Sequence, residues 1–260
     1  MGDSAVPAGP SVPAVPRSAS TVVLVRDDPF EVLMVHRNAR GTFPSAMVFP
    51  GGVLEPSDAD EAWLPLVRGS RAVTDDSGER AWRIAAVREC YEETGVLLVA
   101  GSTEPDAPEV AAPDARRPFL EVVRGSGGVI DLDGIVPFGH WVTPVDRPKR
   151  FDTRFFLAVA PAGQSAIADG GEVVGLDWVR PGDVVERIAS GADGPWVMFP
   201  THMNLKRLAE SRTAEEALDA ARRSTIVRVE PIVERRADGS VVTIIPAEAG
   251  YGVTEEARQG

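Results

Sequence analysis

The stretch that decides the fold is residues 88–96, which read Arg-Glu-Cys-Tyr-Glu-Glu-Thr-Gly-Val. Its acidic residues Glu89, Glu92 and Glu93 stand at positions i, i+3 and i+4, so a helix places them on one face. Like charges this close repel one another and weaken the helix unless a cation neutralises them. The pattern therefore predicts a helix that presents three carboxylates to a metal ion.

The other side of the same helix is apolar. Residues there recur at the spacing of a face buried in a core: Ile84, Val87 and Tyr91. Ala85 and Ala86 lie beside the carboxylates, where their small side chains would let a bulky ligand approach. Gly95 is the expected C-terminal cap. We expect one side of this helix to be anchored in the core while the other presents oxygens.

These residues resemble the box of the Nudix hydrolases, G-x5-E-x7-R-E-U-x-E-E-x-G-U, in which U is a bulky apolar residue. The second half is matched by Arg88, Glu89, Glu92, Glu93, Gly95 and Val96. In the first half, Phe-Pro-Gly-Gly at residues 49–52 supplies the opening glycine, and counting from Gly52 places Asp58, not a glutamate, at the first acidic position. An insertion at about 59–79 separates the halves. The split box resembles the subgroup that includes the mammalian peroxisomal coenzyme A diphosphatases.

The resemblance, which spans residues 21–209, implies a Nudix-type α/β/α sandwich with a mixed sheet. It implies hydrolysis of a nucleoside diphosphate linked to another moiety, and the subgroup favours coenzyme A or acyl-CoA. ADP-ribose or NADH is the enzymatic alternative. A third reading is a catalytically weak metal- or nucleotide-binding module, because of Asp58 and the insertion.

The chemistry of the acidic residues points to Mg2+ or Mn2+, because hard divalent cations bind carboxylates, phosphates and water. Such ions neutralise the diphosphate and lower the pKa of a bound water. We assign Glu89, Glu92 and Glu93 as metal ligands, with Glu92, Glu93 and Glu172 as candidates for the catalytic base. Glu172 enters by resemblance, since many Nudix enzymes carry a glutamate in a comparable loop.

Structural roles are expected for the loop glycines and for the charged pair beside them. In the family the glycine loop, here Gly51 and Gly52, packs beside the carboxylate helix. Arg88 lies four residues before Glu92, so it can brace the carboxylates, together with Asp58.

Substrate contacts are expected from basic and aromatic residues on both sides of the box. The predicted set is Arg37, Arg40, Phe43, Arg150 and Arg154, with Lys149 as a further cation and Trp141 as the alternative to Phe43 for stacking on adenine. Residues 144–154 are the most basic piece of an acidic protein. A solvated turn explains that run equally well.

Composition excludes several classes of function. The formal net charge of −12 argues against general binding to nucleic acid or anionic membranes, which requires basic surface. The single cysteine, Cys90, rules out an internal disulfide and fits a reducing compartment, and its place on the helix favours packing over nucleophilic chemistry. Without an apolar run long enough to span a bilayer or the pattern of a secretion signal, we expect a cytoplasmic protein.

The chain divides into a disordered tail at 1–18, a Nudix domain at 19–210 and an extension at 211–260. Pro, Ala, Ser and Val dominate the tail without an apolar period. In the extension, Thr213-Ala-Glu-Glu216 opens a helix to about Arg223, and two β-rich runs flank a turn, so a hairpin follows. The hairpin either completes the core or forms a contact in a homodimer, and residues 250–260 are expected to be loose.

Overall fold

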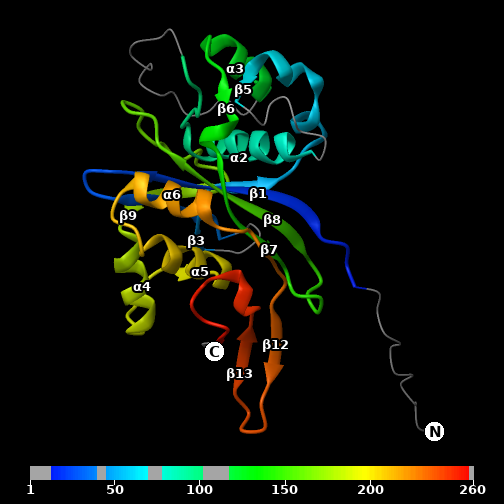
Figure 1. The fold of residues 1–260 in the computed structure, drawn as a ribbon, viewed down its shortest axis with the longest axis vertical. Coiled ribbons are helices and arrows are strands. Elements are labelled where there is room, and N and C mark those ends of the chain that lie inside the picture. The colour runs from blue at the N-terminus through cyan, green and yellow to red at the C-terminus, as the bar shows by residue number, and fades with distance from the viewer. Residues whose placement is uncertain (1–12, 40–44, 70–77, 102–116, 258–260) are drawn as a thin grey trace, which may run out of the picture.

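A mixed sheet lies at the centre of the computed structural model, which describes residues 13–39, 45–69, 78–101 and 117–257 (Figure 1). The strand order is β10-β3-β2-β1-β8-β7-β11, with β4 paired to β1 and β9 paired to β2. The strands of this sheet are β1 (Arg17–Arg26), β2 (Glu31–Arg37), β3 (Ala46–Val48), β4 (Gly51–Val53), β7 (Val136–Val142), β8 (Phe151–Val159), β9 (Val173–Val179), β10 (Trp196–Val197) and β11 (Arg228–Val229).

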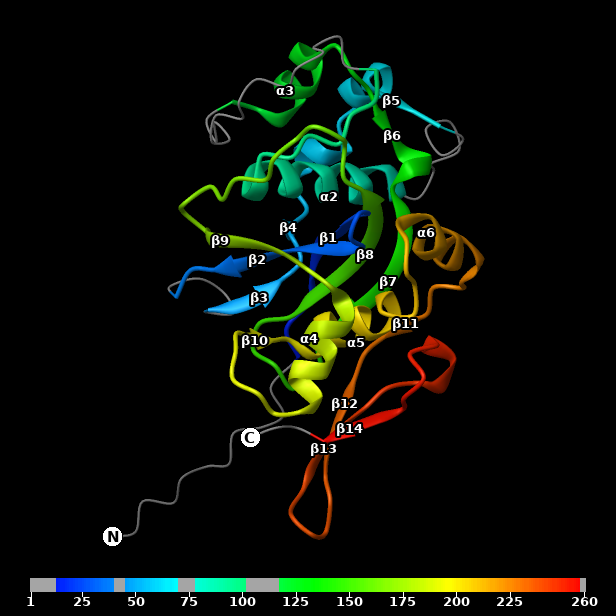
Figure 2. The same cartoon turned by 90° about the vertical axis from the view of Figure 1, so that its left-hand side faces the viewer.

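Helices cover both faces of the sheet, which confirms the predicted α/β/α layers (Figures 1 and 2). One face carries α2 (Glu79–Thr94) and α3 (Phe119–Ser126), and the other carries α4 (Pro181–Ala189), α5 (Phe199–Leu208) and α6 (Ala214–Arg223). Each layer buries its own apolar cluster against the sheet. None of the described helices combines the length and apolarity needed to cross a bilayer.

Strand β1 is the axis of the sheet. It pairs with β8 in parallel and with β2 and β4 antiparallel. Its run Val22 to Val25 is fully buried, because helices cover both faces of the sheet there. Just before this run in β1, Ser20 pairs with Gly52 and Thr21 pairs with Gly51. This pairing fixes the glycine turn to the centre of the sheet.

Helix α2 packs by the apolar face that the sequence predicts. Ile84 and Val87 are fully buried, and Gly95 adopts a left-handed φ of 73° while its N–H donates to the Tyr91 carbonyl at 2.7 Å. The predicted cap is therefore confirmed. Ala85 and Ala86 leave no room for a ligand, because both are fully buried. Their small side chains instead let α2 lie close to the sheet.

Two expectations at the edges of the sheet are wrong. β1 begins at Arg17, and the Ala14 carbonyl accepts a hydrogen bond from Arg150, so residues from 14 to 18 belong to the folded structure. Residues 96–99 read Val-Leu-Leu-Val, a composition that predicts a strand, but they have no regular secondary structure. There the side-chain amide of Gln164 bonds both the N–H and the carbonyl of Leu97 and replaces a strand partner.

The described part of the box insertion lies on the outer side of α2, beside α3. The 3-10 helix η1 (Pro56–Ala59) leads into it, and it contains the 3-10 helix η2 (Glu61–Leu66) and strand β5 (Val67–Arg68). β5 pairs with β6 (Ile130–Asp131), which is followed by η3 (Leu132–Gly134). Trp63, 2% exposed, packs against Phe119 with 5.6 Å between the ring centroids and the rings tilted by 39°. The apolar residues Trp63, Leu64 and Leu66 predict a short amphipathic helix, and the structure forms a 3-10 helix there that anchors the insertion. Residues 70–77 lie outside the described chain.

The C-terminal extension adds a second small sheet to the molecule. It consists of β12 (Ile232–Arg235), β13 (Val241–Ile244) and β14 (Glu255–Ala257), with η4 (Ala247–Ala249) between the last two strands. β12 and β13 form the predicted hairpin, which projects from the body in Figure 1. Residues 250–257 are not loose: Tyr251 is buried, and its hydroxyl bonds Trp141 and Asn204.

Candidate active site

The glycine turn and the carboxylate helix meet directly. The Gly51 N–H donates to Glu93 Oε2 at 3.0 Å. A Cβ built on Gly52 would lie 2.5 Å from the carboxyl atoms of Glu89. At Gly51 a Cβ would instead strike the backbone of β1, at 2.6 Å from the Ser20 carbonyl oxygen. Residue 51 is therefore glycine because of the sheet, and residue 52 is glycine because of the acidic helix.

Arg88 is a buried hub that holds the acidic residues in place. Its Nε and Nη2 donate to the two carboxylate oxygens of Asp58 at 2.9 and 3.1 Å. Its Nη1 reaches Glu89 at 2.8 Å and Glu92 at 2.9 Å. Asp58 is 1% exposed. The predicted contacts of Arg88 with Asp58 and Glu92 are present, and the shorter acid Asp58 forms a two-pronged pair with the guanidinium group.

Arg37 connects the helix to the loop that precedes β9. Its Nη2 donates to the Gly51 carbonyl at 2.9 Å and to Glu93 at 3.1 Å. Its Nη1 lies 3.6 Å from Glu172. The Glu172 side chain is 76% exposed. The backbone N–H of Glu172 donates a hydrogen bond to the Asp169 carboxylate. The structure therefore brings Glu172 to the acidic group from a loop distant in sequence.

The acidic residues carry more negative charge than their arginines neutralise. Burial raises the pKa of Glu93 to about 8 and that of Glu89 to about 7, against the lowering influence of Arg37 and Arg88 respectively. Repulsion from Glu172 adds to both increases. Burial also raises the pKa of Glu92. Carboxyl groups that hold protons near neutral pH are poised to exchange them for a metal cation.

The donor set suits a hard divalent cation, because it consists of carboxylate oxygens beside an open glycine turn. Among the described residues, no three acidic, imidazole or thiol side chains are yet gathered closely enough to hold a metal ion. The arginines explain this, since Glu89 and Glu92 both turn to Arg88 Nη1 and Glu93 turns to Arg37 and Gly51. A bound cation would have to draw these oxygens away from the guanidinium groups.

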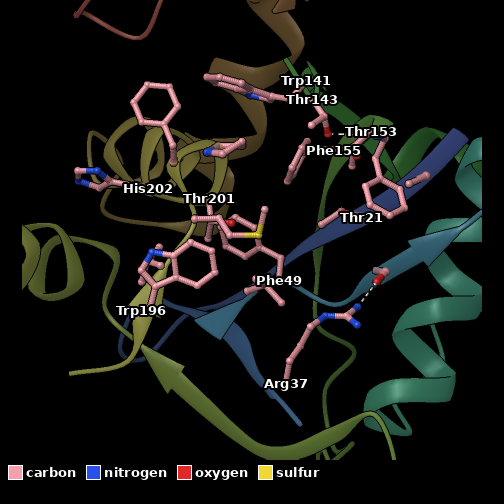
Figure 3. Close-up of a pocket in the computed structure, with 18 of the residues that line it drawn as sticks. Thr21, Arg37, Phe49, Trp141, Thr143, Thr153, Phe155, Trp196, Thr201 and His202 are labelled. Atoms are coloured by element: carbon pink, nitrogen blue, oxygen red, sulfur yellow. Dashed lines mark hydrogen bonds between the residues drawn. The ribbon is translucent and has the colours of Figure 1, made fainter. Parts of the chain in front are cut away.

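A cleft of about 2570 Å3 opens from this acidic group. In Figure 3 Arg37 lies at one end of the view and Trp141 at the other, with Phe49 and Phe155 between them. The far walls come from the β7–β8 loop, from helix α5 and from the C-terminal hairpin. Ligand pockets in proteins commonly measure about 300–1,000 Å3, so this cleft has space for a large substrate.

Arg150 is not directed into the cleft. It is 8% exposed, and its nitrogens donate to the carbonyls of Thr143 and Ala14 and to Glu230, at 3.0, 2.9 and 2.5 Å. The geometry disagrees with the expected phosphate contact, because all three nitrogens already have partners inside the protein. The geometry indicates instead that Arg150 fixes the β7–β8 loop.

Arg154 also lies away from the cleft, over the Trp82 ring of α2 at 4.4 Å. Strand alternation is the reason, because Phe151, Thr153 and Phe155 of β8 line the cleft while Arg154 points to the opposite face. Trp141 lines the cleft but is 2% exposed and packs between Phe199 and Tyr251, so stacking on a base does not fit it.

Two predicted contacts, Arg40 and Phe43, lie outside the described residues. Sequence reasoning missed Arg17 and Arg147, which line the cleft together with Lys149. The basic run at residues 144–154 was a usable signal for Arg147, and the alternation along β8 would have excluded Arg154.

The chain belongs to the Nudix hydrolases. The model of the NUDT19 Nudix domain matches residues 70–208, which is more than half of the chain. The crystal structure of a Nudix hydrolase from Alicyclobacillus acidocaldarius is 32% identical, with a TM-score of 0.67 over 79% of this chain and 96% of that one. Nudix hydrolases generally use divalent metal cations.

Two curated relatives carry the same name, acyl-coenzyme A diphosphatase NUDT19. The protein from chicken (Gallus gallus) is 32% identical, in an alignment that covers 69% of this chain and 61% of that protein. The human protein is 28% identical, in an alignment that covers 85% of this chain and 72% of that protein. The chain thus spans less than two thirds of the chicken relative.

Proposed function

We propose that this chain is a Nudix pyrophosphohydrolase that cleaves the diphosphate of coenzyme A or acyl-CoA with Mg2+ or Mn2+. The observation that carries the proposal is the meeting of Glu89, Glu92 and Glu93 with the Gly51–Gly52 turn at one end of a large cleft. The similarity to two acyl-coenzyme A diphosphatases supports the choice of substrate.

The metal would be held by Glu89, Glu92 and Glu93. When bound, it would neutralise the diphosphate and lower the pKa of a coordinated water. The remaining functions belong to residues of the chain. Arg88 positions Glu89 and Glu92 through its pair with Asp58, and Arg37 keeps Glu93 against the glycine turn.

The reaction joins one water oxygen to phosphorus and breaks the anhydride P–O bond. One proton of the water passes to a carboxylate, and the leaving phosphate takes the electrons of the broken bond. With coenzyme A the products are 4'-phosphopantetheine and adenosine 3',5'-bisphosphate. Glu172 suits the proton-accepting role because its carboxylate is exposed yet lies beside Arg37; Glu92, half-buried on α2, is the alternative.

The shape of the cleft supports a substrate with a long arm. Beyond the glycine turn its floor is aromatic and aliphatic, with Phe49, Phe155 and Phe199 among the lining residues. The exposed Trp196 and the adjacent Val197 extend this apolar lining along β10. Apolar walls of this kind favour pantetheine or an acyl chain over a second sugar.

A panel of diphosphates tests the proposal. Purified protein is incubated with coenzyme A, acyl-CoA, ADP-ribose and NADH, each with Mg2+, with Mn2+ and with chelator, and the products are separated by chromatography. We expect metal-dependent cleavage with the highest kcat/KM for coenzyme A or acyl-CoA. Preference for ADP-ribose or NADH would identify the alternative enzyme, and no cleavage of any compound would favour a binding module.

A further inference from the structure

The cleft contains a second charged region, at its far end from the acidic helix. We propose that Arg17, Arg147 and Lys149 form an anion subsite for a phosphate monoester on the nucleoside part of the substrate. The inference rests on the proposed function, because it places a second anionic group on the molecule whose diphosphate binds at Gly51–Gly52. This subsite would bind its phosphate through cationic side chains alone, whereas the diphosphate binds together with a metal ion.

Most cationic side chains that line the cleft already have partners among the described residues, and these three do not. Arg37 and Arg88 are bound to the glutamates of the acidic group. Arg187 and Arg235 donate to the carbonyls of Pro195 and Gly239. Within the described part of the chain, Arg17, Arg147 and Lys149 form no ion pair and no side-chain hydrogen bond. Arg147 is half-buried, whereas Arg17 and Lys149 are exposed, and all three line the cleft. Three unpaired cations facing one cleft of a protein of net charge −12 point to an anionic ligand.

The backbone brings the three residues together. The Arg17 N–H donates to the Arg150 carbonyl at 2.9 Å, and Arg17 stands opposite Phe151 in the β1–β8 pair. The Arg147 N–H donates to the Pro144 carbonyl at 3.2 Å, closing a turn that carries Lys149 two residues later. The cations thus come from the first residue of β1 and from one adjoining loop. Asp146 of the same loop is exposed and is not among the residues that line the cleft.

Arg150 makes this loop a fixed element. Its side chain joins the Thr143 carbonyl at the end of β7, the Ala14 carbonyl before β1 and Glu230 before the hairpin. It is a positioning residue, because it acts through the loop that carries Arg147 and Lys149. Because the loop backbone is already held, binding an anion there has to order the Arg147 and Lys149 side chains but not the loop itself.

The separation of the two regions suits one substrate. Thr21 stands opposite Gly51, and Arg17 lies four residues earlier on the same strand. At a rise of ~3.3 Å per residue, the subsite lies about 13 Å along β1 from the glycine turn. Long arginine and lysine side chains shorten that span. A nucleotide that carries both a 5'-diphosphate and a ribose phosphate presents two such anionic groups.

The experiment measures preference for the ribose phosphate. Values of kcat/KM are determined for coenzyme A and for dephospho-coenzyme A, which lacks the 3'-phosphate, in wild-type protein and in the double variant Arg147→Ala/Lys149→Ala. The control is Arg212→Ala/Arg222→Ala, which removes one positive charge from α6 and one from the segment just before it, both outside the cleft. We expect wild type and control to prefer coenzyme A by about tenfold or more, and the Arg147/Lys149 variant to lose that preference. A preference that survives in this variant, or is absent from wild type, overturns the subsite.

A binding measurement separates this inference from the proposed function. Calorimetric titrations compare adenosine 3',5'-bisphosphate with AMP in the same three proteins. Tighter binding of the bisphosphate that is lost only in the Arg147→Ala/Lys149→Ala variant supports the subsite even if coenzyme A is not cleaved. Equal affinity for the two nucleotides in wild-type protein rejects the subsite, even if the enzyme cleaves coenzyme A.

Discussion

Each end of the cleft is built around a buried arginine, but the two ends differ in the sign of their unbalanced charge. Around Arg88 and Arg37, five carboxylates share two guanidinium groups: Asp58, Glu89, Glu92, Glu93 and Glu172. Around Arg150, two carbonyls and Glu230 satisfy the arginine, and Arg17, Arg147 and Lys149 have no ion-pair partner within the described chain. The acidic end therefore has an excess of negative charge, and the end around Arg150 has an excess of positive charge. Divalent cations at the first end and a phosphate group at the second would offset these two imbalances of charge.

Removing one carboxylate from the acidic end should have the largest effect. We expect Glu92→Gln to lower kcat about 10²–10³-fold, because it removes a proposed metal ligand. Stability should change little, since Glu92 is half-buried and Arg88 is its ion-pair partner among the described residues. Steady-state kinetics and thermal unfolding measure both. Glu121→Gln, on an exposed glutamate of α3, is the control, and an unaltered rate in Glu92→Gln would remove the metal assignment.

The two loop glycines should separate catalysis from folding. Gly52→Ala places a methyl group 2.5 Å from the Glu89 carboxyl, which can rotate away, so activity should fall about 10–100-fold with little loss of stability. Gly51→Ala places it 2.6 Å from the Ser20 carbonyl oxygen, so the sheet must shift at a cost of about 1–3 kcal/mol. Urea unfolding and kinetics on both variants measure the difference. A strongly destabilised but fully active Gly52→Ala would contradict this division.

At the basic end, replacing Arg150 should lower the stability of the protein more than it alters substrate binding. Arg150→Ala removes the donor of two carbonyls and one of the two donors of Glu230, which keeps Arg228, so we expect a loss of about 2 kcal/mol in the free energy of unfolding. Arg154→Ala removes a contact with the Trp82 ring and should cost about 0.5–1 kcal/mol. Urea unfolding compares the two. If Arg150→Ala kept full stability but raised KM for every diphosphate, the direct phosphate contact expected from sequence would be restored.

The smallest expected effect is a dependence on pH of the rise in Tm that Mg2+ causes, because Glu89 and Glu93 change protonation. The folded pKa values of Glu93, about 8, and Glu89, about 7, exceed the ordinary value of 4.5. Between these values the folded state holds protons that the unfolded chain releases, so the metal-free protein loses stability as pH rises from about 4.5 to 8. Mg2+ should raise Tm by a few degrees more at pH 8 than at pH 5.5, and this difference should disappear in Glu89→Gln/Glu93→Gln. Equal shifts at both pH values would show that these carboxyl groups do not bind the ion.

Much of the acidic end follows from local sequence. Three glutamates on one helical face, the apolar face behind them and Gly95 depend on helix geometry alone, and α2 reproduces them. The contact between Arg88 and Asp58 crosses the insertion, yet the motif predicts it. The neighbouring alanines were misjudged because a helical wheel does not show how closely the sheet approaches.

The basic end depends on tertiary structure that the sequence does not display. Arg150 and Arg147 are equally basic in sequence, and only the approach of residue 14 and of Glu230 decides which side chain is buried. The disordered tail was predicted too long for the same reason, because β1 gains its first residues by pairing with β8. Residues 96–99 have strand composition but meet a glutamine side chain where a strand partner was expected.

The most direct test locates a metal ion in the protein. Crystals soaked in Mn2+ give an anomalous signal that identifies the ion without reference to its ligands. The account predicts a peak bounded by Glu89, Glu92 and Glu93 and adjoining the Gly51–Gly52 turn, with Glu92 released from Arg88. No peak there at saturating Mn2+, with Glu89 and Glu92 still paired to Arg88, would contradict it.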